Sequence, residues 1–147
     1  MFLDDSKVLD LSNNVLTLRG TKALAAAATH CTSLTSLDLS WSEIGGIAGA
    51  KAVAAALPRS RLATLELAGN EIGLNGARAL ALALPHAPQL TSLDLSNSNV
   101  RDDGARAVAA AAAGPGAAVT TLNLTEADLS DAAEVELCAA YPRIVRV

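Results

Sequence analysis

The feature that most constrains this chain is a sequence pattern that recurs every 28 or 29 residues. Residues 62–74 read LATLELAGNEIGL, in which leucines are spaced by three and then by two residues. The pattern reads LTSLDLSWSEIGG one period earlier and LTSLDLSNSNVRDD one period later, and the outer copies read VLDLSNNVL and VTTLNLTEADL. The five copies start near residues 6, 34, 62, 90 and 119. Such regular phasing predicts a stack of repeated structural units.

Each copy combines two periodicities. The leucines spaced by two residues indicate a strand, because alternate side chains of a strand face the same side. The second half of each copy places a glycine before alanine, leucine or valine at helical spacing, as in GTKALAAAA, GAKAVAAAL, GARALALAL and GARAVAAAA. Each repeat is therefore expected to contribute one strand and one helix.

This pattern resembles the long leucine-rich repeat of the ribonuclease-inhibitor type, which also occurs in intracellular immune receptors and in the Ran GTPase-activating protein. The resemblance implies an α/β solenoid, or horseshoe, with a parallel β-sheet on the concave face and α-helices on the convex face. It implies one leucine-rich-repeat domain of about five repeats over residues 1–147. Within residues 130–147 we expect a helix from Asp131 to Ala140, capped at Ser130 or Asp131, and then a short strand.

Composition and charge argue against several classes of function. The net charge is -4 and the pI is about 5.0, so binding to nucleic acid or to an anionic membrane is disfavoured. The amino-terminal sequence lacks the apolar stretch of a secretory signal, and no apolar run is long enough for a transmembrane helix. Cys31 and Cys138 lie several repeats apart, so we expect no disulfide and predict an intracellular, most simply cytoplasmic, protein.

The residue between the two strand leucines of each repeat is expected to point to the concave face. These residues are Asp10, Asp38, Glu66, Asp94 and Asn123. Because neighbouring strands lie about 4.8 Å apart, stacked like charges repel unless a cation or a partner relieves them. The column has two interpretations: a docking strip for a basic protein surface, or solvated carboxylates that are simply common at this repeat position.

A column of cations recurs near the start of the predicted helices. It consists of Lys22, Lys51, Arg78 and Arg106. Cations near a helix amino terminus oppose the helix dipole, so their recurrence needs a reason. They either pair with acids of adjoining turns, such as Asp102 or Asp103, form a solvated face, or make a basic binding stripe on the convex side.

Trp41 is the only tryptophan and follows the second strand, on a predicted turn. Tryptophan is enriched among the residues that dominate binding energy at interfaces, so Trp41 is a candidate anchor for a partner. The alternative is that its ring covers the neighbouring turns as a lid.

One position in the turns is expected to bond the backbone of neighbouring repeats, because an unpaired buried amide is costly. The residues at this position are Asn14, Ser42, Asn70, Ser98 and Ala127. The last repeat has lost the polar side chain, so we predict a weaker, frayed last turn.

The helices carry alanine where solvent-facing helices usually carry charge. Either the genome is biased toward alanine, or another subunit covers the convex face. The apolar residues ahead of the first predicted repeat are only Met1, Phe2 and Leu3. We therefore expect them to cover the amino-terminal edge of the stack incompletely.

No residue pattern in the chain indicates catalysis, a cofactor or a metal site. His30 and His86 lie two repeats apart, and the glycine-rich stretches lack the Lys-Ser/Thr of a phosphate-binding loop. We therefore predict a non-enzymatic scaffold or adaptor that binds a protein partner through the acidic concave face. The alternatives are a structural subunit packed in a large complex through its alanine-rich face and repeat ends, and a GTPase regulator like the Ran activator.

Overall fold

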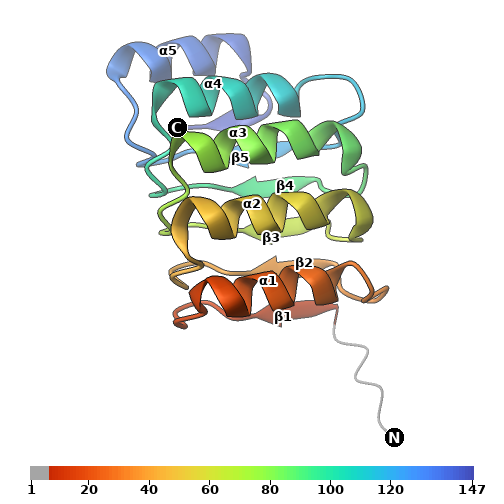
Figure 1. Ribbon diagram of the computed structural model, residues 1–147. Helices are drawn as coiled ribbons and strands as arrows, with labels where there is room; N and C mark the ends of the chain where they lie inside the picture. Colours follow the sequence, from red (N-terminus) through yellow and green to blue (C-terminus); the bar gives the residue numbers. More distant parts are fainter. Residues whose placement is uncertain (1–6) are drawn as a thin grey trace, which may run out of the picture.

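The computed structural model describes residues 7–147, and these residues form a stack of strand–helix units (Figure 1). The strands are β1 (Val8–Asp10), β2 (Ser36–Asp38), β3 (Thr64–Glu66), β4 (Ser92–Asp94), β5 (Thr121–Asn123) and β6 (Val145–Arg146). The helices are α1 (Thr17–Ala28), α2 (Gly46–Ala56), α3 (Gly73–Ala83), α4 (Arg101–Ala112) and α5 (Asp131–Ala140). Two short 3-10 helices, η1 (Leu57–Arg59) and η2 (Leu84–His86), follow α2 and α3.

All described strands form one parallel sheet in chain order, β1 to β6, and the helices form a second layer on one side of it (Figure 1). The register reproduces the sequence period, because each strand leucine pairs with its counterpart in the next repeat, as Leu37 does with Leu65 and Leu65 with Leu93. These side chains are almost fully buried and form one core with the helices. The expected α/β leucine-rich-repeat solenoid is confirmed.

A ladder of polar side chains joins the turns that follow the strands. Asn70 is 3% exposed, and its Nδ2 donates to the carbonyl oxygens of Leu39 at 2.7 Å and Leu67 at 3.0 Å. The backbone amides of Ser42 and Ile44 donate to its Oδ1 at 3.3 and 3.4 Å. These bonds connect two successive repeats, which is the role expected of this position.

The last turn lacks this ladder, because Ala127 occupies the position and is buried. A different contact ties it to the preceding repeat: the Asp102 carboxylate accepts from the backbone N–H of Ser130 at 2.8 Å and from its hydroxyl at 2.7 Å. Ser130 caps α5 as expected, because its hydroxyl oxygen accepts from the backbone N–H of Ala133. Fraying of this turn stays a prediction, and the expected cap of Met1, Phe2 and Leu3 lies outside the described residues.

Adjacent helices touch through small residues. A Cβ added to Gly76 would lie 2.8 Å from Cγ2 of Ile72 and 2.9 Å from the Cβ of Ala50 on α2. The same relation recurs one repeat later, where a Cβ on Gly104 would lie 3.1 Å from the Cβ of Ala77. Both alanines are fully buried. The glycine at the fourth position of these helices therefore sets how closely the helices approach.

Replacing Gly76 with alanine is expected to lower the free energy of unfolding by about 1–3 kcal/mol, because the added methyl overpacks the α2–α3 contact. The matched control is Gly20→Ala at the same position of α1, where the nearest side-chain atom, Leu16 Cβ, is 3.9 Å away. There the better helix propensity of alanine should raise stability by up to about 1 kcal/mol. Urea denaturation of both variants measures the difference, and a gain at both positions would contradict the packing argument.

Replacing Asn70 with alanine is expected to lower the free energy of unfolding by about 3 kcal/mol, because buried amides and carbonyls of two repeats lose their partner. Asn70→Ser should lose less, since Ser42 and Ser98 bond backbone carbonyls from the equivalent position. Chemical denaturation followed by circular dichroism tests this, and equal losses for the two variants would speak against the ladder.

Candidate functional site

The sheet brings the predicted acidic column together on the face away from the helices. The register pairs Asp10 with Asp38, Asp38 with Glu66, Glu66 with Asp94, and Asp94 with Asn123. Asp10 is exposed and the other four side chains are half-buried. Four carboxylates on neighbouring strands therefore share one surface.

The aspartates of the column also have a local structural role. One carboxylate oxygen accepts the backbone N–H two residues later, at 2.9 Å for Asp10, 2.8 Å for Asp38 and 2.7 Å for Asp94. The second oxygen of Asp94 accepts from Asn123 Nδ2 at 2.8 Å. Hydrogen bonds from Ser12 lower the pKa of Asp10, so that carboxylate is held in its charged form. Turn capping thus accounts for aspartate at these strand ends without a partner.

Glu66 differs from the aspartates, and sequence reasoning did not separate it from them. Its longer side chain makes no hydrogen bond to any residue in the range 7–147. Burial raises the pKa of Glu66, and the negative charges of Asp38, Asp94 and Asp10 raise it further. The centre of the column is therefore the place where a cation from a partner would relieve the most repulsion.

The column changes sign at its carboxyl-terminal end. Arg146 on β6 pairs in register with Asn123 on β5, so the strip runs from acid on β1 to β4 to a cation on β6. The only signal for this in the sequence was the short strand predicted in RIVRV. The acidic surface is thus confined to the first four strands.

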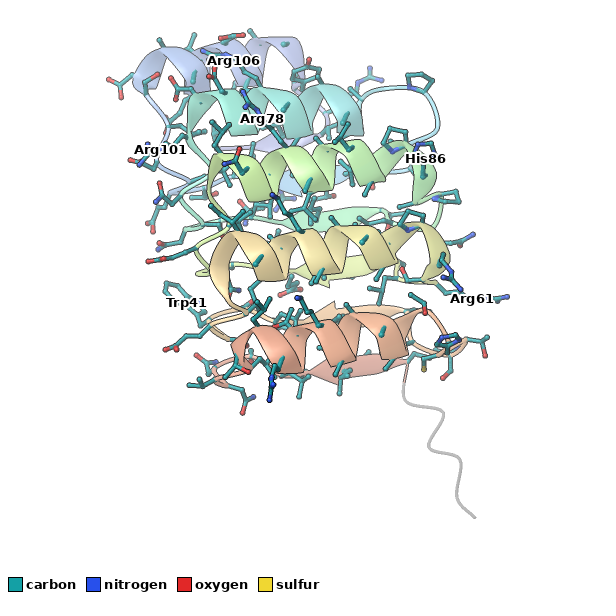
Figure 2. All side chains as sticks on the ribbon, in the orientation of Figure 1. Trp41, Arg61, Arg78, His86, Arg101 and Arg106 are labelled. Atoms are coloured by element: carbon teal, nitrogen blue, oxygen red, sulfur yellow. The ribbon has the colours of Figure 1, made fainter. Side chains whose placement is uncertain are left out.

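The ring of Trp41 covers part of the neighbouring turn, and its role as an anchor for a partner stays a prediction. Its backbone adopts the left-handed conformation, with φ 56°. Its ring lies against Gly69 of the next turn, where an added Cβ would clash with ring atom Cδ2. The residue is nevertheless 53% exposed, and Figure 2 shows it at the edge of the stack. Two pockets of about 460 and 490 Å³ adjoin this edge, and exposed Glu71 lines both of them.

The cationic column occupies the sixth position of α1 to α4. Figure 2 shows two of its members, Arg78 and Arg106, on the helix layer. Within the described chain, only Arg106 of this column forms ion pairs: one with Asp103 at 3.3 Å, and one with Glu136 on α5 at 3.0 Å, which was not expected. The expected pairing is therefore correct for Asp103, whereas Asp102 bonds Ser130 instead. Lys22, Lys51 and Arg78 form no ion pair with any residue between 7 and 147.

Within residues 7–147, no group of three or more His, Cys, Asp or Glu side chains is placed to hold a metal ion. Over that same range no helix combines the length and apolarity needed to cross a membrane.

Comparison with known proteins identifies the fold. A family model described as leucine-rich repeat matches residues 7–25, 30–54, 62–81 and 86–109. Among solved structures, the chain is similar to one titled "Leiomodin-1 Actin-Binding Site 2 (ABS2)", with a TM-score of 0.62 and 15% sequence identity. That match covers 98% of this chain and 73% of the other. No curated protein matches the sequence.

Replacing Glu66 with glutamine is expected to raise the free energy of unfolding at pH 7 by about 0.5 kcal/mol, because a like charge leaves the column. The pKa of Glu66 is higher in the folded than in the unfolded state. The wild-type protein therefore loses stability as the pH rises from the unfolded-state pKa through the folded-state pKa. Below both pKa values the glutamate is neutral, and the advantage of the variant should vanish. Urea denaturation at pH 7 and below about pH 4 measures this, with Glu71→Gln as an off-column control.

Proposed function

The chain belongs to the leucine-rich repeat family, and we propose that it is a non-enzymatic adaptor that binds a basic protein surface on its acidic concave face. The observation that carries this proposal is the row of four in-register carboxylates, in which Glu66 lacks a hydrogen-bond partner among the described residues and has a raised pKa. Lysine or arginine side chains of a partner would relieve this repulsion and would steer the encounter.

Trp41 supports the proposal as an anchor at the edge of the same surface. Asp38 lies three residues before it on β2, and Glu43 and Glu71 are exposed on the turns around it. Packing against Gly69 fixes the ring, so a partner loses little side-chain entropy on contacting its free part. Arginine suits this position, because a guanidinium stacks on an indole face and pairs with nearby carboxylates.

The structural comparison supports an interaction role in general terms. The leiomodin structure is titled an actin-binding site, so a chain of similar fold recognises a protein. A shared fold does not transfer a particular partner, because the residues on the surface decide recognition. The ribonuclease-inhibitor-type subclass stays a prediction.

A second candidate function, a subunit of a larger assembly, is favoured by the apolar residues on the outer faces. Leu82 on α3 is 78% exposed and Val135 on α5 is 71% exposed. Another subunit that covered these side chains would remove their apolar surface from water, which is favourable. If this candidate is correct, the isolated chain should self-associate, and sedimentation velocity over a wide concentration range would reveal it; a clean monomer would argue against it.

The concave face is tested by capture of partners from the native source at low salt, comparing wild type with the Asp38→Lys, Glu66→Lys variant. We expect at least one partner to be retained by wild type and lost by the variant, with binding that weakens as salt rises. The control, Asp131→Lys with Glu134→Lys, makes the same change in net charge on α5, away from β2, β3 and Trp41, and should retain the partner. Equal capture by all three folded proteins, or equal loss in the control, would refute the proposal.

A further inference from the structure

Charge is segregated between the two layers of the first three repeats. The helices α1, α2 and α3 and the 3-10 helices after them contain no aspartate or glutamate. They carry Arg19, Lys22, Lys51, Arg59 and Arg78. The helical side of these repeats is therefore positive, opposite in sign to the strand column behind it.

A groove of about 320 Å³ runs between α1 and α2 on this positive side. Its walls are the alanine side chains Ala25, Ala26, Ala52, Ala55 and Ala56. Lys22 lies toward the amino-terminal end of α1, whereas His30 and Arg59 follow the carboxyl-terminal ends of α1 and α2. The groove therefore has an apolar wall and a cation near each end.

The groove exists because of side-chain size at one helical position. The tenth residue of each of the first four helices is Ala26, Ala55, Leu82 and Ala110. Leu82 shows that this position accepts a larger side chain in solvent, since it is 78% exposed. Alanine at both Ala26 and Ala55 leaves the space between α1 and α2 open.

We propose that the α1–α2 groove binds an acidic amphipathic helix of a partner protein. Neither Lys22 nor Arg59 forms an ion pair within residues 7–147, so both charges are free to meet carboxylates at the two ends of such a helix. The small alanine side chains of the groove allow the backbone of a docking helix to come close. The apolar stripe of that helix would cover the alanine methyl groups. This inference does not depend on the concave surface, which has the opposite charge.

Two other occupants fit the groove less well. Surfaces that bind membranes insert tryptophan, phenylalanine or leucine, whereas the apolar residues that line this groove are all alanine. The acidic column of a second copy lies on the side of its sheet away from the helices. Its acidic helix α5 has only ten residues and already pairs Glu136 with Arg106 of the same chain. A convex, negatively charged helix matches both the shape and the charge.

The test uses two displayed libraries of helical peptides of about four turns, one with Asp and Glu and one with Lys and Arg on the polar face. Both are panned on the wild-type protein, and the affinity of an enriched acidic peptide is measured by fluorescence anisotropy. Ala55→Leu, which fills the groove with the side chain found in α3, should weaken binding about ten-fold or more. Lys22→Glu with Arg59→Glu should do the same and reduce the salt dependence.

Matched control variants distinguish binding in the groove from general effects of side-chain size and net charge. Ala110→Leu makes the same exposed substitution on α4, and Lys51→Glu reverses a charge of α2 outside the groove lining, so both should leave binding within about two-fold. The concave variant Asp38→Lys, Glu66→Lys should also retain the peptide, which distinguishes this site from the proposed function.

Several results would overturn the inference. They are a failure to enrich acidic over basic peptides, an enriched peptide whose affinity is unchanged by Ala55→Leu, and peptide binding that is lost only in the concave variant. Binding of anionic phosphatidylserine vesicles that Lys22→Glu abolishes would identify a membrane surface instead. Concentration-dependent dimers that the same substitution abolishes would identify a second copy of the chain.

Discussion

The different spacings of strands and helices constrain the rest of this molecule. Neighbouring strands lie about 4.8 Å apart, whereas packed helices lie about 8–10 Å apart. A stack with one strand and one helix per repeat must therefore curve. Small residues must also line the contacts between its helices, so that neighbouring helices can approach closely. This close approach is made possible by the contacts of Gly76 with Ala50 and of Gly104 with Ala77. The leucine core can then repeat in register from β1 to β5, and the polar turn ladder repeats from the turn after β1 to the turn after β4.

The same constraint separates two populations of alanine. Buried alanines such as Ala50, Ala77 and Ala105 lie where helices meet, and there a larger side chain would push the repeats apart. Exposed alanines such as Ala26 and Ala55 have no such restriction, as Leu82 at the equivalent position of α3 shows. Alanine bias alone therefore accounts only for the exposed set, and it is this set that opens the α1–α2 groove.

The two candidate surfaces arise from opposite faces of one repeated unit. On the sheet, the aspartates cap the turns that follow their strands, and stacking these turns also places their charges in one row. On the helices, cations recur at one helical position, and α5 supplies Glu136 only to the last of them, Arg106. The first three repeats are therefore acidic on the strand side and basic on the helical side, whereas α4 and α5 also carry acidic residues.

The sequence by itself determined the repeat, its strand and helix, the buried leucines and the membership of each charged column. It could do so because a period of 28 or 29 residues converts directly into in-register neighbours. Only the tertiary structure decided that burial and the neighbouring carboxylates raise the pKa of Glu66, and that Trp41 packs on Gly69. It also decided that Arg106 meets Glu136 and that a groove lies between α1 and α2. Those outcomes depend on side-chain reach and on distances between repeats, and a linear pattern does not encode either of these quantities.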